Sequence, residues 1–194
     1  MKGVIFTEFL ELVEGRFGMS TADRVLTRGC PFHGGYTSVG SYNHQDLLAM
    51  VSVLSEETGV ASSDLVRAFG KHLFQAFLNN YPHVFSDVHS TEQLMRKVED
   101  TIHVEVRKLS PDAELPQFEF SYGAGGEFEV TYRSRRPFAL LAEGLLEAAI
   151  HHFEEDVVLD RMDLQDADGR AARFIFRPVA RAPNAKHAIA ASAC

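Results

Sequence analysis

The stretch TEQLMRKVEDTIHVEVRKL, residues 91–109, lies where helix-forming sequence gives way to strand-forming sequence. Its apolar residues recur at helical spacing and predict one amphipathic helix whose stripe faces the core: Leu94, Met95, Val98, Ile102, Val106 and Leu109. Ser90, followed three residues later by Gln93, predicts a capping box at the start. His103 lies one position off this stripe, at its edge. From this segment alone, a half-buried structural histidine with a satisfied hydrogen bond is the favoured interpretation.

The segments on either side differ in their periodicity. Ahead of this stretch, apolar spacing predicts helices over residues 3–15, 20–28, 44–58 and 62–80, with a glycine-, proline- and serine-rich loop at 29–40. After it, alternation and turn residues predict strands at 118–122, 128–132, 157–165 and 173–179, with a helix over 137–153. Helices therefore come first, and a small antiparallel sheet of about four strands with one long helix follows. This segregation predicts an α+β fold.

No flexible linker or internal repeat divides the chain. We expect a single domain over residues 1–181, with a helical lobe over about 1–60 and a second lobe over about 61–181. The alanine-rich residues 182–194 are predicted to be a disordered tail.

The composition excludes several classes of protein. The chain has 194 residues and a formal net charge of −8 with no basic block, so nucleic-acid binding is disfavoured. Glu8, Glu11 and Glu14 interrupt the N-terminal apolar segment, which is therefore no signal peptide. The longest apolar stretch, residues 137–150, is too short and too acidic to span a bilayer. We expect a cytoplasmic protein that does not enter membranes.

The cysteines and histidines give little support for a metal cluster. Cys30 and Cys194 are the only cysteines, so neither a disulfide framework nor a cysteine metal site is predicted. Adjacent His151 and His152 point about 100° apart on a helix and cannot easily share one ion. The 15 phenylalanines, with no tryptophan, suit ordinary core packing and would equally suit a flat apolar ligand.

A second group of polar residues follows the strand at 128–132. In an extended chain Tyr132, Ser134 and Arg136 point the same way at steps of about 6.6 Å, which makes a row of hydrogen-bond donors. Such a row suits one or two carboxylates, and Arg136 can bind one bidentately. In isolation, a strand end with surface arginines is still the favoured interpretation.

Together, His103 and this donor row fit haem. Haem needs an axial base, anchors for two propionates and a flat apolar slot. A carrier protein for an apolar carboxylate such as a fatty acid remains the alternative, although it would leave His103 without a role. A haem peroxidase would need a distal acid or base, and none stands among the candidate residues of the pocket. We therefore expect a protein that is not an enzyme.

These residues identify a family resemblance that covers nearly the whole chain, from MKGVIF to AARFIFRP. With a helical histidine some thirty residues before a Tyr-x-Ser-x-Arg motif, the chain resembles the haem-nitric oxide/oxygen-binding (H-NOX) domain family, bacterial relatives of the haem domain of soluble guanylate cyclase. The resemblance implies a haem b buried between the two lobes, His103 as its proximal iron ligand, and Tyr132, Ser134 and Arg136 as the propionate anchors.

The resemblance also implies residues that pack on the haem. Pro116 stands where the family has a proline that distorts the haem, and Ile5 lies against the macrocycle. The distal pocket, where gases bind, is implied to comprise Phe9, Leu73, Phe77, Leu141 and Leu145.

Leu141 carries the expectation about selectivity. Family members that hold oxygen stably place a tyrosine there, whose hydroxyl donates to the bound gas. Leucine cannot donate, and Phe9 and Leu73 add no polar group, so an NO sensor that excludes oxygen is implied. Tyr36 could in principle move in as a substitute donor.

The resemblance further implies how the signal leaves the domain. Five-coordinate ferrous haem would bind NO, and CO as well, and a conformational change would signal to a separate partner. That partner would be a histidine kinase of two-component signalling or a cyclic-di-GMP synthase or phosphodiesterase. Some members carry a cysteine cluster implicated in zinc binding and redox sensing, and the absence of those cysteines implies that this mode is missing.

Overall fold

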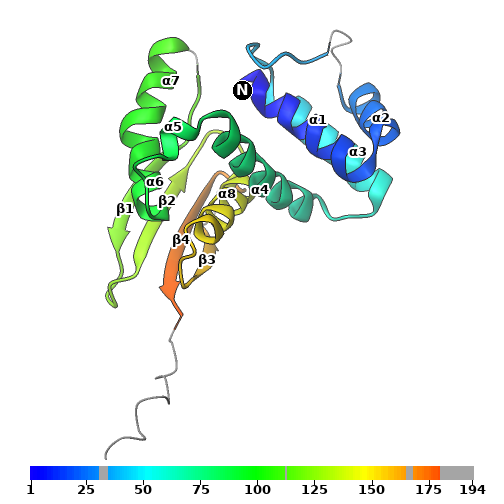
Figure 1. Cartoon of the computed structure of the whole chain (residues 1–194). Helices are drawn as coiled ribbons and strands as arrows, with labels where there is room; N and C mark the ends of the chain where they lie inside the picture. Colours follow the sequence, from blue (N-terminus) through cyan, green and yellow to red (C-terminus); the bar gives the residue numbers. More distant parts are fainter. Residues whose placement is uncertain (31–34, 112, 165–167, 180–194) are drawn as a thin grey trace, which may run out of the picture.

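The computed structural model describes residues 1–30, 35–111, 113–164 and 168–179 (Figure 1). The helices of the first half are α1 (Gly3–Phe17), α2 (Met19–Gly29), α3 (His44–Thr58), α4 (Ser62–Asn80), α5 (Pro82–Phe85), α6 (Thr91–Lys97), the π-helical turn η1 (Val98–Ile102) and α7 (His103–Leu109). The second half contains β1 (Gln117–Tyr122), β2 (Phe128–Arg133), α8 (Ala139–His152), β3 (Val157–Asp163) and β4 (Ala171–Pro178). The predicted α+β class, helices first and sheet second, is confirmed.

The four strands form one antiparallel sheet in the order β1-β2-β4-β3. The register places Tyr132 of β2 between Phe118 of β1 and Ala172 of β4. Alternate residues of the strands point to one face, and α6 and α8 cover that face. The resulting core contains Met95, Phe128, Val130, Tyr132, Ala139, Ala142, Leu146, Ala172, Phe174 and Phe176.

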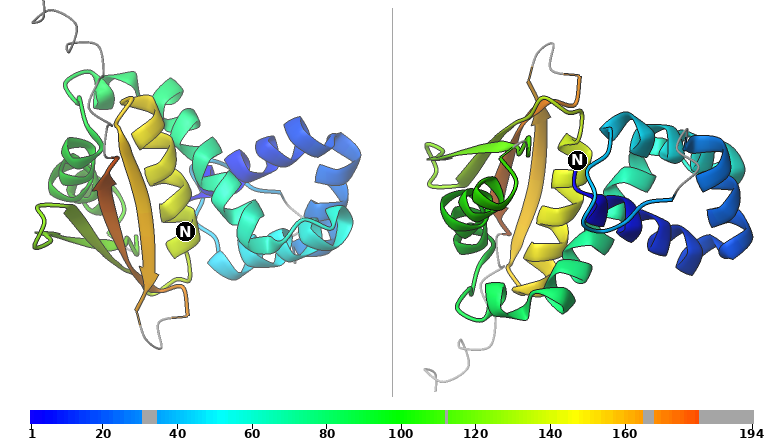
Figure 2. Two further views of the ribbon diagram at one scale, coloured as in Figure 1. Left: turned by 90° about the horizontal axis from the view of Figure 1, so that it is seen from below. Right: turned by 90° about the horizontal axis from the view of Figure 1, so that it is seen from above.

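The helices α1 to α3 form a separate lobe beside α8 and the sheet, as both views in Figure 2 show. Their core continues into α4 and the start of α8 through Phe69, Leu73, Phe138 and Leu141. The division of residues 1–181 into two lobes at about residue 60 remains a prediction, and the predicted tail at 182–194 lies outside the described residues.

Two glycines set how closely α4 and α8 approach. A Cβ built on Gly70 would lie 2.3 Å from the carbonyl oxygen of Leu141, and one on Gly144 would lie 2.1 Å from that of Arg67. Both distances are far below van der Waals contact, so no larger residue fits without moving a helix.

The helix predicted over residues 91–109 is not one regular helix. Its N-cap is confirmed, because the Ser90 hydroxyl accepts a hydrogen bond from the backbone amide of Gln93 at 3.2 Å. The wider turn of η1 then shifts the later residues around the helix axis, and beyond it the predicted stripe is only half-buried at Ile102 and Val106 and fails at Leu109. Leu109 is 84% exposed, whereas His103, expected at the edge of the stripe, is buried.

Other predicted helix boundaries hold to within two residues. The helix predicted to begin at Ser20 begins at Met19, with Gly18 at its N-cap and no side-chain cap. The short helix α5 was not predicted. In the described part of the chain, no helix is long and apolar enough to cross a membrane.

Candidate functional site

His103 is the centre of the candidate site. It begins α7 directly after the π-helical turn, and it is 8% exposed. Its Nδ1 lies 3.1 Å from Oε2 of Glu99, one turn earlier in the chain. Burial lowers the pKa of His103, and the hydrogen bond and charge of Glu99 act in the opposite sense. The imidazole is therefore favoured neutral, with Nδ1 bound to a carboxylate and Nε2 left to bind a metal ion.

An aromatic chain connects this histidine to the sheet. The His103 ring stacks on Phe118 of β1, with ring centroids 5.7 Å apart and planes inclined by 19°. The ring of Phe118 in turn packs against that of Tyr132 of β2, with ring centroids 5.9 Å apart. Pro116 is partly buried and directly precedes β1, two residues before Phe118. The structure thus brings His103, Tyr132 and the segment of Pro116 together around one phenylalanine.

The three predicted carboxylate anchors do not form an extended row. β2 ends at Arg133, and the Ser134 hydroxyl accepts a hydrogen bond from the backbone amide of Arg136 at 3.0 Å. This local turn is typical of serine, which competes with strand hydrogen bonding. Tyr132 is 3% exposed, and its burial raises the pKa of the phenol, so it remains a neutral donor.

Arg136 retains an unused donor. Its side chain is 13% exposed, and Nη2 lies 3.1 Å from Oε2 of Glu114. Its Nε is buried and has no hydrogen-bond partner among the described residues. The charge of Arg136 also lowers the pKa of His44 on α3, after burial as the larger cause. Glu114 is half-exposed, and a second carboxylate could share or replace it on this guanidinium.

The residues implied to form the distal pocket lie together. Phe9 of α1, Leu73 and Phe77 of α4, and Leu141 and Leu145 of α8 all belong to or pack against one apolar cluster, and Ile5, expected against the macrocycle, packs on the same cluster. Every one of these side chains is a hydrocarbon, so the group offers no side-chain hydrogen-bond donor. Tyr36 stacks on Phe6 at 4.5 Å and packs edge-on against Tyr42 at 4.7 Å, which fixes its ring within that aromatic group.

Sequence reasoning missed three residues that support this site. Glu99 could have been found from its i, i+4 spacing to His103 on a helix. Phe118 was predicted in a strand, but its contact with His103 depends on how the helix crosses the sheet. Glu114 lies in irregular backbone and carried no signal.

Together, the fold and the site define a class: an α+β protein with a buried imidazole, His103, able to bind a metal ion and a guanidinium, Arg136, able to bind a carboxylate. Comparisons with known proteins agree with this class. Residues 2–161 match the family model described as Haem-NO-binding. The chain belongs to this haem-NO-binding (H-NOX) family of haem-binding gas sensors.

Solved structures of the family resemble this chain over nearly its whole length. The unliganded Fe(II) H-NOX protein of K. algicida is 32% identical, with a TM-score of 0.82, and the match covers 93% of this chain and 98% of that one. The H-NOX of Shewanella woodyi in the Fe(II)CO state is 38% identical, with a TM-score of 0.79 and coverages of 95% and 98%. The H-NOX protein of S. oneidensis in the Fe(II)NO state is 26% identical, with a TM-score of 0.82 and coverages of 91% and 98%. No curated protein matched.

The residues present fit a haem group. The unused Nε of Arg136 suits a propionate carboxylate, and the carboxylate-bound Nδ1 of His103 is the usual arrangement of a metal-ligating histidine. Haem, when bound, supplies a ferrous iron that binds diatomic gases.

Proposed function

We propose that this chain is a haem-based NO sensor that binds haem b through Nε2 of His103. The observation that carries the proposal is the buried His103 imidazole, whose Nδ1 is held by Glu99 within the fold of a haem-binding family. A neutral, oriented imidazole is the form that coordinates iron, and its carboxylate partner raises its basicity as a ligand.

In this proposal the remaining residues have distinct roles. Tyr132, Ser134 and Arg136 hold the propionates, and the unused Nε of Arg136 supports that role. Pro116 and Ile5 press on the haem from opposite lobes. In this proposal residues 1–181 form a single domain. The haem lies between its helical lobe, about residues 1–60, and its haem-holding lobe, about residues 61–181.

Selectivity for NO follows from the apolar distal side. A tyrosine donor at position 141 would stabilise oxygen, which gains partial negative charge when bound, by about 1–3 kcal/mol. Leu141 cannot donate, and Phe9, Leu73, Phe77 and Leu145 are equally apolar. NO and CO depend far less on such a donor, so these gases bind and oxygen is excluded.

The output of the sensor passes to a separate cytoplasmic partner. By family resemblance, this partner is a histidine kinase or a cyclic-di-GMP synthase or phosphodiesterase, and the domain itself has no catalytic role. Affinity capture from the native organism with the NO-loaded domain, compared with the gas-free domain, tests this step.

The haem content of the purified protein tests the ligation itself. We expect about one haem per chain in the wild type and a loss of most of it in His103→Ala. His151→Ala is the matched control, because His151 is an exposed histidine at the end of α8 and should retain full occupancy. Equal haem content in His103→Ala and the wild type would contradict the assignment.

A carrier of an apolar carboxylate is the second candidate, and Arg136 is the observation that favours it. Its free Nε would serve a fatty acid as well as a propionate. The carrier predicts that His103→Ala leaves ligand occupancy unchanged and that the purified protein shows no haem absorption band. The same pair of proteins therefore separates the two candidates.

A further inference from the structure

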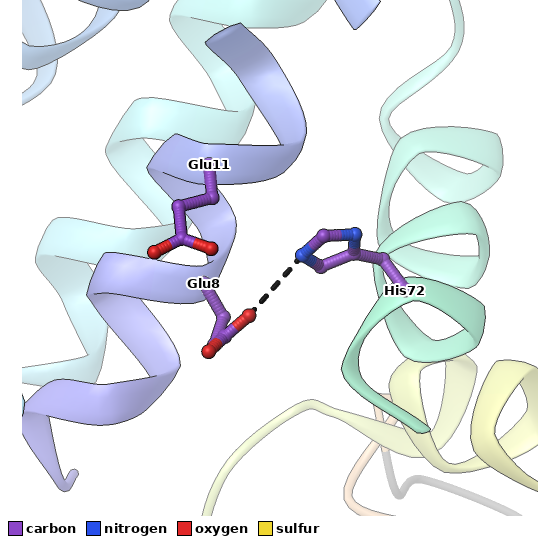
Figure 3. A group of neighbouring side chains, drawn as sticks. All are labelled: Glu8, Glu11 and His72. Carbon is purple, nitrogen blue, oxygen red and sulfur yellow. Dashed lines mark ion pairs between the residues drawn. The ribbon is translucent and has the colours of Figure 1, made fainter. Parts of the chain in front are cut away.

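A group of three side chains capable of binding a metal ion joins α1 to α4, apart from the haem site. Glu8 and Glu11 project from one face of α1 toward His72 on α4, as Figure 3 shows. One ligand atom from each residue lies within 4.8 Å of the other two. Oε2 of Glu8 is 3.3 Å from Nε2 of His72.

The Glu8 carboxylate and one ring nitrogen of His72 are buried without adequate partners. The Glu8 side chain is only 9% exposed, and His72 is its sole charged contact among the described residues. Nε2 of His72 is buried and has no hydrogen-bond partner in the described part of the chain, because the short approach to Glu8 lacks hydrogen-bond geometry. Burying a carboxylate is costly unless a cation or hydrogen-bond donors compensate it.

We propose that Glu8, Glu11 and His72 bind a divalent transition-metal ion of the zinc class. One imidazole nitrogen and two carboxylate oxygens are a ligand set typical of such ions, with water in the fourth position. The distances support the geometry. Tetrahedral zinc with bonds of about 2.0–2.1 Å has ligand–ligand edges of about 3.3–3.4 Å, and the separation of Glu8 from His72 already has this value.

Glu11 completes the site from the solvent side. It is exposed and has no ion pair to any described residue. Its side chain can therefore rotate and bring a carboxylate oxygen closer to the ligand atoms of Glu8 and His72. The position opposite the buried pair then opens to water, which gives both an entry path and a fourth ligand.

A bound ion would fasten α1 to α4. Phe9 and Leu73, the neighbours of Glu8 and His72 in the chain, belong to the apolar cluster shared by the two lobes. A bound ion would therefore cross-link α1 of the helical lobe to α4. The proposal does not depend on haem, since neither His103 nor the propionate anchors take part.

Zinc titration of the untagged, haem-loaded full chain, in competition with a chromophoric zinc chelator, tests the proposal. We expect one equivalent to bind, and at least tenfold weaker binding in Glu8→Gln and in His72→Gln. The matched controls are Glu14→Gln and His151→Gln, which should bind zinc as the wild type does. Glu14 is an exposed residue of α1, and His151 is exposed at the end of α8. No bound equivalent, or binding that survives both Glu8→Gln and His72→Gln, overturns the site.

Thermal unfolding gives an independent measurement. We expect saturating zinc to raise the midpoint of the wild type by about 5 °C, and to leave that of Glu8→Gln unchanged. Without zinc, Glu8→Gln should be at least as stable as the wild type, because an uncompensated buried charge has been removed. A zinc-insensitive wild type combined with a destabilised Glu8→Gln would indicate a protonated His72–Glu8 ion pair and overturn the proposal. The haem content of the same samples tests the haem assignment separately, because loss of zinc binding with full haem content would overturn only the zinc site.

Discussion

At the scale of single residues, the Glu99 carboxylate determines how His103 can act. The two side chains are 3.1 Å apart, and Arg107 lies 3.9 Å from the other oxygen of Glu99, so the carboxylate is itself restrained. A carboxylate on the far nitrogen of a ligating histidine fixes both the tautomer and the orientation of the ring. We therefore assign Glu99 as a positioning residue for the proposed iron ligand.

Replacing Glu99 with glutamine should weaken the attachment of haem. We expect haem to dissociate about tenfold faster from Glu99→Gln, since partners of this kind contribute roughly 10- to 100-fold to metal affinity. Transfer of haem to an excess of an apoprotein acceptor measures the rate. Glu105→Gln is the control, because Glu105 pairs with Lys108 on the exposed side of the same helix. Equal rates in the two variants would remove Glu99 from the site.

Arg136 and its neighbour Arg135 provide a test variant and a matched control for the proposed propionate anchor. Arg136→Ala should lose haem about tenfold faster than the wild type, because a buried charge-assisted contact is removed. Arg135→Ala should behave as the wild type, since its side chain is 85% exposed. Haem loss at the same rate in both variants would contradict a specific anchor at Arg136.

At the scale of elements, the π-helical turn shows what sequence patterns could and could not predict. The periodicity of residues 91–109 correctly indicated a helix and its cap at Ser90. It could not reveal the extra residue in the turn Val98–Ile102, because Val98 and Ile102 keep the four-residue apolar spacing of a regular helix. His103, directly after that turn, is buried, and Leu109 is exposed. The extended row expected of Tyr132, Ser134 and Arg136 was also wrong, because β2 ends at Arg133 and the Ser134 hydroxyl then accepts a hydrogen bond from the Arg136 amide.

The crossing of α4 and α8 depends on its glycines. Gly144→Ala should lower the free energy of unfolding by about 2–3 kcal/mol, because the new methyl group meets the carbonyl oxygen of Arg67 and forces the helices apart. Chemical denaturation measures the change. Gly15→Ala, a helical glycine of α1 with no atom near its Cβ position, should instead be neutral or gain up to about 1 kcal/mol. Similar losses in both variants would show that the loss does not come from the close contact between α4 and α8.

At the scale of the whole molecule, the order of elements and the family were predictable from the sequence, but the contacts between lobes were not. The α+β order follows from a change of period from helical to alternating, and His103 with Tyr132, Ser134 and Arg136 identified the family. Glu8 and His72, in contrast, lie 64 positions apart and meet only because α1 packs on α4. Nothing in the sequence links the two residues, and Glu8 served there only to exclude a signal peptide.

Acid should destabilise the molecule through histidines at the junction of the lobes. Burial, followed by the charge of Arg136, lowers the pKa of His44 in the folded protein, whereas a histidine in the unfolded chain titrates near about 6.5. Below that pH the unfolded chain binds more protons, so stability falls as the pH falls. We expect the unfolding midpoint to drop between pH 7.5 and 5.5, and to drop less steeply in His44→Gln. Exposed His83→Gln is the control, and equal slopes in the two variants would contradict the role of His44.

The absorption spectrum of the reduced protein, recorded anaerobically, in air and with NO, tests the central claim most directly. We predict that the reduced protein shows a haem spectrum and that NO changes this spectrum at once. In air, the spectrum of a stable oxygen complex should not appear. Leu141→Tyr should acquire such a complex, because its hydroxyl supplies the missing donor. A wild type that forms a stable oxygen complex in air would contradict selectivity for NO, and a protein with no haem band would contradict the whole functional account.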